Sequence, residues 1–197
     1  MAYDADKAAA FLKAQSNRYK DGECWTLAED AVVGAGGASS KVLTKNFSPE
    51  SAYVWGKVVP AAQLKPGDVL QFTGYDWTRT IETDITMPQN HEKGGDKFSR
   101  IEGGKRGEPQ HTAIVVSVVS AGIVDVIEQN IPPTVGPVQT TRLVLIPRPK
   151  SVVTTRENIT YTDQGDPDKK RQLKGDIVTV VTITETVDNP PRCYRPQ

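Results

Sequence analysis

Two runs rich in valine and isoleucine, HTAIVVSVV at residues 111–119 and IVDVIEQN at residues 123–130, constrain the fold more than any other feature of the chain. They are separated by Ser-Ala-Gly, which is the length of a hairpin connection, so they predict two adjacent antiparallel strands. A turn through residues 120–122 places position 111 opposite position 130 or 131, to within one or two residues. We therefore expect His111, Glu128 and Asn130 to lie side by side, with Glu128 and Asn130 on one face of the sheet.

The rest of the chain predicts helices first and strands afterwards. Apolar residues at helical spacing indicate a helix within residues 4–15, capped by Asp4, and a second helix that begins at Cys24 and ends at the glycines of residues 34–37. KPGD at residues 65–68 is a turn that leads into the buried strand VLQF. The fold class predicted is α+β, with N-terminal helices packed on an antiparallel sheet.

The later segments are assigned less evenly. Residues 74–108 are polar and rich in turn residues, which favours a long surface loop that serves as a lid or a binding element, or is disordered. QTTRLVLIP predicts a further strand, and we expect VVTTRENITYT and IVTVVTITETV near the C-terminus to pair with each other as an extra strand pair. We predict one domain over residues 1–149 and a β extension over residues 150–197 that packs on that domain.

Composition excludes several classes of partner. The chain has 197 residues, with 24 Lys and Arg against 24 Asp and Glu, so no basic excess favours nucleic acid or an anionic membrane. No apolar run approaches the roughly 18 residues that span a bilayer, and the N-terminal stretch does not resemble a signal peptide. The sequence also shows no Cys/His cluster and no phosphate-binding glycine loop, so we expect no metal and no organic cofactor.

Cys24 admits two interpretations. It lies on the apolar stripe of its helix, and free cysteine is among the most buried residue types, which favours a packing role. However, a thiol in the first turn of a helix also lies at the positive end of the helix dipole, which favours the thiolate, and the unpaired backbone N–H groups there can bind an oxyanion.

A cysteine nucleophile needs a base, and the chain has two histidines that could serve. His91 lies in the polar segment and fits a solvated loop residue, whereas His111 opens a strand beside a carboxylate and an amide that could orient it. The alternative for this group is a polar hairpin end with no chemical role.

GECWTLAEDAV, GDVLQF, HTAIVVSVV and VIEQN, in this order, resemble the CHAP amidases, a branch of the papain-like NlpC/P60 superfamily of cysteine peptidases and amidases. The resemblance covers about residues 3 to 147 and implies a papain-like fold. It also implies that Cys24 is the nucleophile, that His111 is the base, and that Glu128 and Asn130 complete the site. Two positions depart from the family pattern. Glu23 stands where a glutamine commonly assists the oxyanion hole, and Gln110 stands where a glycine commonly precedes the histidine.

The function implied by this resemblance is cleavage of amide bonds in bacterial peptidoglycan, either between muramic acid and the stem peptide or within peptide crossbridges. Trp77 and Tyr75 are the candidate substrate-binding residues, while Trp25 and Trp55 are expected in the core. The substrate lies in the cell wall, but the N-terminal stretch does not resemble an export signal. We therefore expect the protein to act outside the cell or in the periplasm, after cell lysis or specialised secretion. An immunity or delivery protein is a further open class of partner. The competing functions are a papain-like module that binds glycopeptide or a protein without cleaving it, and a deamidase or acyltransferase with the same Cys and His chemistry.

Overall fold

The computed structural model describes residues 2–88, 95–131, 136–163, 165 and 167–197. The chain forms two compact units. The first contains residues 1–77, 104–147 and 187–197, and the second contains residues 78–103 and 148–186. The strands are mostly antiparallel and are preceded by helices, so the α+β class is confirmed.

The first unit is built on a six-stranded sheet with the order β1-β10-β2-β5-β6-β7, in which every neighbouring pair is antiparallel. The central hairpin pairs Ile114 with Ile127 and Val115 with Val126, and Ser120 with Ile123 at the turn. The hairpin prediction is therefore confirmed. The strands are β1 (Lys57–Val58), β2 (Val69–Phe72), β5 (His111–Ser120), β6 (Ile123–Glu128), β7 (Gln139–Val144) and β10 (Arg192–Arg195), and a 3-10 turn, η1 (Ala61–Gln63), precedes β2.

The helices α1 (Ala5–Lys13) and α2 (Cys24–Gly34) confirm the two helical predictions, and a short α3 (Ser40–Leu43) follows them. Asp4 caps α1 as expected, because its carboxylate accepts from the backbone N–H of Lys7 at 3.0 Å. One hydrophobic cluster joins α1 and α2 to the sheet. It contains Leu12, Leu27, Ala28, Ala31, Val32, Tyr53, Trp55, Val69, Ile114, Ile127 and Tyr194.

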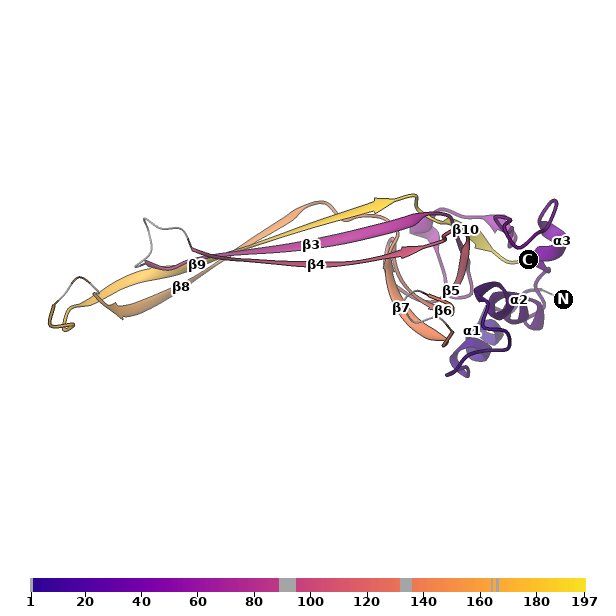
Figure 1. The fold of residues 1–197 in the computed structure, drawn as a ribbon, viewed down its shortest axis with the longest axis horizontal. Coiled ribbons are helices and arrows are strands. Elements are labelled where there is room, and N and C mark those ends of the chain that lie inside the picture. Colours follow the sequence, from indigo (N-terminus) through magenta and orange to yellow (C-terminus); the bar gives the residue numbers. More distant parts are fainter. Residues whose placement is uncertain (1, 89–94, 132–135, 164, 166) are drawn as a thin grey trace. The chain divides into compact units, whose positions relative to one another are not determined.

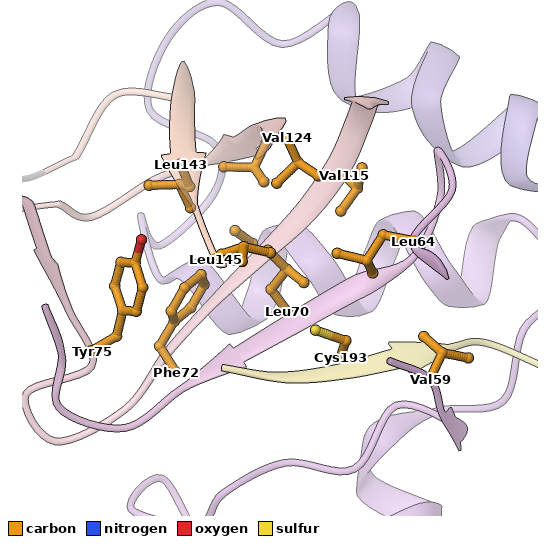
Figure 2. Close-up of a cluster of buried hydrophobic side chains, with 12 residues drawn as sticks. Val59, Leu64, Leu70, Phe72, Tyr75, Val115, Val124, Leu143, Leu145 and Cys193 are labelled. Atoms are coloured by element: carbon orange, nitrogen blue, oxygen red, sulfur yellow. The ribbon is translucent and has the colours of Figure 1, made fainter. Parts of the chain in front are cut away.

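Alternate residues of the same strands form a second cluster, because successive side chains of a strand point to opposite faces. Val69 and Ile114 belong to the cluster with the helices, whereas Leu70, Phe72 and Val115 belong to the second cluster, drawn in Figure 2. Cys193 lies in this second cluster and is 3% exposed. The central strands are thus buried on both faces.

The second unit is a four-stranded sheet with the order β4-β3-β9-β8. Its strands are β3 (Tyr75–Thr86), β4 (Asp96–Arg106), β8 (Ser151–Thr162) and β9 (Gln172–Asp188). Three strand ends belong to the first unit: residues 75–77 of β3, 104–106 of β4 and 187–188 of β9. Figure 1 shows β8 and β9 as one long hairpin, which pairs without a break from Ser151 with Ile183 to Thr162 with Gln172.

Two expectations are corrected by this sheet. Residues 74–108 are not simply a long loop, because strands β3 and β4 occupy most of the segment. The extra C-terminal strand pair exists, but it joins the sheet of β3 and β4, and residues 187–197 return to the first unit, where β10 pairs with β2. The contacts therefore do not follow a boundary at residue 149.

Side chains in the second unit are mostly exposed or half-buried. The carboxylate of Glu185 is an exception, since it is 1% exposed and accepts hydrogen bonds from the backbone and guanidinium of Arg148. These bonds lower the pKa of Glu185 although burial opposes its ionisation. Among the described residues of either unit, no helix is both long and apolar enough to cross a membrane.

Candidate active site

Cys24 is the first residue of α2, and its side chain is half-buried. The turn before it is fixed by Asp21, whose carboxylate accepts from the backbone N–H of Glu23 at 3.0 Å and from the hydroxyl of Thr26 at 2.8 Å. The cap residue Glu23 has an extended backbone, and its side chain makes no capping hydrogen bond. The first-turn N–H groups of α2 are thus left without a side-chain cap and lie next to the sulfur, where an oxyanion would need donors. Cys24 and Cys193 are both free thiols.

His111 is brought to Cys24 by the start of β5. Its ring is 5% exposed and lies 5.9 Å from the ring of Phe72, the residue that pairs with it in the ladder of β2 and β5. Its Nε2 lies 2.8 Å from Oε2 of Glu128, and the Cys24 side chain lies near enough to the imidazole to raise its pKa. Because Nε2 is engaged with Glu128, Nδ1 is the nitrogen left for the thiol.

Glu128, the last residue of β6, is itself held from behind by Arg106. The guanidinium donates from Nε to Oε2 at 2.9 Å and from Nη2 to Oε1 at 2.7 Å, which is the bidentate geometry of a strong ion pair. The side chains are 8% exposed for Arg106 and 0% for Glu128. A continuous row of interacting groups therefore runs from the Cys24 sulfur through His111 and Glu128 to Arg106.

Electrostatics within this row favour a protonated imidazole. Burial alone would lower the pKa of His111, but the hydrogen bonds and charges of Cys24 and Glu128 outweigh it and raise that pKa to about 9. Burial likewise opposes ionisation of Glu128, yet the hydrogen bonds from His111 and Arg106 lower its pKa to about 2. At neutral pH the site thus holds an imidazolium against a carboxylate.

Asn130 lies elsewhere than the hairpin alternation suggested. Its backbone has φ +65°, so the extended conformation ends there, and its amide donates to the carboxylate of Glu23 at 3.2 Å. The structure thus brings Cys24, His111 and Glu128 together and places Asn130 beside Glu23.

Gln129 lies between Glu128 and Asn130 in the sequence and is fully buried. Its amide nitrogen donates to the Glu23 carbonyl at 2.7 Å, and its amide oxygen accepts from the Tyr19 N–H at 3.1 Å. Gln129 therefore ties the end of β6 to the segment before α2.

The aromatic candidates lie in the core of the first unit rather than beside Cys24. Tyr75 is 1% exposed, its hydroxyl donates to the carbonyl of Val144 at 2.7 Å, and burial raises the pKa of its phenol. Trp77 packs partly buried against the same cluster. Trp55 is fully buried, as expected, and Trp25 is half-buried. His91 lies outside the described residues.

Sequence reasoning missed Arg106 and Gln129. Arg106 is one of three arginines in a segment interpreted as a loop, and no local pattern distinguishes it from a solvated charge. Gln129 stands between Glu128 and Asn130, which the sequence analysis selected, so this position was the one signal that could have identified it.

Within the described part of the chain, no group of three or more His, Cys, Asp or Glu residues could hold a metal ion. No family model, no curated protein and no solved structure matches this chain.

Proposed function

We propose that the protein is a cysteine-dependent hydrolase that cleaves amide bonds of bacterial peptidoglycan, as an N-acetylmuramoyl-L-alanine amidase or a crossbridge endopeptidase with a papain-like CHAP fold. The observation that carries this proposal is that the half-buried Cys24 thiol lies near a buried His111, which is oriented by Glu128. A packing cysteine needs no such partner. The substrate class comes from the resemblance of the sequence to the CHAP amidases.

In the proposed mechanism the thiol proton resides on His111, and the Cys24 thiolate attacks the amide carbonyl carbon. The carbonyl oxygen becomes an oxyanion that accepts hydrogen bonds from the uncapped N–H groups of α2. As the C–N bond breaks, the imidazolium gives its proton to the leaving amine, which leaves a thioester on Cys24. His111 then takes a proton from water, the hydroxide attacks the thioester, and the carboxylic acid and the thiolate are released.

Glu128 and Arg106 act behind the base. A carboxylate that is ionised at neutral pH holds the imidazole by Nε2 and stabilises its protonated form, and the guanidinium holds the carboxylate. Asn130 orients Glu23 instead of the imidazole in this arrangement. Because Glu23 is exposed and anionic beside the oxyanion position, it cannot supply the donor that a glutamine would give there.

The proposal is tested by incubating purified peptidoglycan with the native protein and with Cys24→Ala. We expect the native protein to release new amino groups or peptides and to reduce turbidity, and the variant to do neither. Equal release by both proteins would refute a thiol nucleophile. Glu23 favours the second candidate, a module that binds glycopeptide without cleavage, for which both proteins would sediment with peptidoglycan and neither would release products. Intact-mass analysis of protein and lipid substrates would reveal a deamidase or acyltransferase.

A further inference from the structure

A hollow of about 360 Å³ lies in the first unit. It is lined by residues from four segments that are separated in the sequence: Ala52, Gln71, Thr73, Gln110, Pro190 and Arg192. Two of these are direct neighbours of residues that interact with Cys24. Gln110 precedes His111, and Ala52 precedes Tyr53, whose phenol pKa is raised by burial and then by the charge of Cys24. Two parts of its lining are therefore joined directly along the chain to residues that lie near Cys24.

The amide of Gln110 is fixed with its nitrogen available. Its oxygen accepts from Nε2 of Gln71 at 3.1 Å and from the hydroxyl of Thr73 at 2.9 Å. Gln71 is 2% exposed and its own oxygen accepts from the Trp55 indole at 3.1 Å and the Thr112 hydroxyl at 2.9 Å. The wall is thus rigid, and within the described residues the Nε2 of Gln110 donates to no protein acceptor.

Arg192 provides a positive charge on the same wall. It pairs with Gln71 in the ladder of β10 and β2, and its side chain lines the hollow. The neighbouring arginine of the same strand, Arg195, is engaged with Asp68 at 2.8 Å, and Arg106 is engaged with Glu128. Arg192, by contrast, takes part in no ion pair with any residue that the structure describes. An arginine beside an available amide N–H is the donor set that a carboxylate accepts from.

We propose that this hollow binds a free carboxylate of the substrate, with Arg192 and the Gln110 amide as its donors. This inference rests on the proposed function, and it defines the substrate class as a peptide with a free carboxylate near the cleaved amide. The carboxylate fixes the peptide in one direction across Cys24. Gln110 thereby acquires a role that the glycine common at this position in the CHAP amidases could not fill.

Binding is measured on the Cys24→Ala protein, so that no turnover is required. The probes are the α-amide of N-acetyl-alanyl-glutamate, which carries one carboxylate, and its uncharged match, the α-amide of N-acetyl-alanyl-glutamine. Binding is followed by NMR through the side-chain N–H signals of Arg192 and Gln110. We expect the acid to bind about tenfold more tightly than the amide and to shift both signals. Arg192→Gln should abolish this preference. The matched control Lys57→Gln, which removes one positive charge from the exposed β1 strand of the same sheet, should preserve it.

Equal affinities for the acid and the amide, or an acid-dependent shift confined to other residues, would overturn the carboxylate site. Binding of inorganic phosphate that excludes the acid from these two side chains would show a phosphate site and would also overturn it. The outcome is separable from hydrolysis. Cleavage of peptidoglycan by a native protein that shows no acid preference refutes the carboxylate site alone, whereas an acid preference in a protein that cleaves nothing refutes the hydrolase alone.

Discussion

Replacing Arg106 with methionine isolates the ion pair at the back of the site. The substitution keeps much of the aliphatic length of the side chain but removes the guanidinium, leaving the Glu128 carboxylate buried with His111 beside it. Removal of one partner of a buried ion pair costs about 3–5 kcal/mol, because the remaining charge loses its compensation. We expect the free energy of unfolding of Arg106→Met to fall by this amount at pH 7.

The pH dependence of this loss identifies its cause. The pKa of Glu128 is lowered from 4.5 to about 2, so its ionised form contributes stability that is present above pH 4.5 and is lost as the pH falls through 2. At 1.36 kcal/mol per pKa unit, the contribution is about 3 kcal/mol at pH 7 and about 1 kcal/mol at pH 3. In Arg106→Met the pKa of Glu128 returns towards its ordinary value, so less of this stability exists to be lost. The difference between the two proteins should therefore narrow by about 2 kcal/mol between pH 7 and pH 3.

Urea denaturation followed by tryptophan fluorescence measures both proteins at the two pH values. Arg142→Met is the matched control, because Arg142 also forms a two-bonded pair with a carboxylate, Asp125, but on the surface of the hairpin. We expect little change for this control, since water screens an exposed pair. A loss in Arg106→Met that is the same at pH 7 and pH 3 would show that the lost packing of the side chain, and not its charge, matters. That result would refute the electrostatic reasoning.

Three further outcomes are expected. Iodoacetamide should alkylate Cys24 in the native protein and spare Cys193 until the protein unfolds. Cys193 is 3% exposed, and burial, followed by the charge of Asp68, raises the pKa of its thiol to about 12. Peptide mass spectrometry after digestion measures the order of labelling, and labelling of Cys193 before Cys24 would contradict the assigned site. The rate of product release from peptidoglycan should fall above about pH 9, since the raised pKa of His111 keeps the imidazolium available to protonate the leaving amine only below that value, and a constant rate up to pH 10 would exclude His111 as the acid. Gln129→Ala should lower the free energy of unfolding by about 1–3 kcal/mol, because the Glu23 carbonyl and the Tyr19 N–H lose a buried partner. Asn130→Ala should change this free energy little in the same urea titration. Equal losses of stability in the two variants would contradict the anchoring role of Gln129.

The central hairpin was predictable because its signal is local. Valine-rich runs on either side of the short turn at residues 120–122 predict the pairing of β5 and β6 to within one or two residues, and this pairing predicts which residues lie near position 111. The same reasoning identified the start of α2 at Cys24, since the apolar spacing and the terminal glycines both mark one helix. These predictions needed no knowledge of any distant contact.

Strands β3 and β4 were missed for a physical reason. Their segment contains few apolar residues, and after Tyr75 those of YDWTRTIETDIT (Trp77, Ile81 and Ile85) are four positions apart. That pattern lacks the strict alternation of apolar and polar residues that indicates a half-buried strand. The four-stranded sheet buries few side chains, so its strands can be polar while backbone hydrogen bonds still pair them. Hydrophobic periodicity in a sequence reflects the burial of side chains in a core, and this unit has only a small core.

Asn130 shows where alternation along a strand stops being informative. Parity placed it on the same face as Glu128, but the positive φ of Asn130 ends the extended conformation one residue after Gln129. The backbone turns, and the amide reaches Glu23 instead of His111. Asparagine tolerates this conformation better than most residues, so the same residue type that suggested a catalytic role also permits the turn.

The proposed site is assembled at the ends of three elements, and this explains why its geometry depends on so few long-range contacts. Cys24 begins α2, His111 begins β5 and Glu128 ends β6. Antiparallel pairing of β5 and β6 places the last two together without any further interaction. What remains is to dock the start of α2 against that edge, and Gln129 does so through hydrogen bonds to residues on the chain just before the helix. If the hydrolase proposal holds, the sequence Glu-Gln-Asn thus serves two purposes, since its first residue orients the base and its second fixes the distance between the base and the nucleophile.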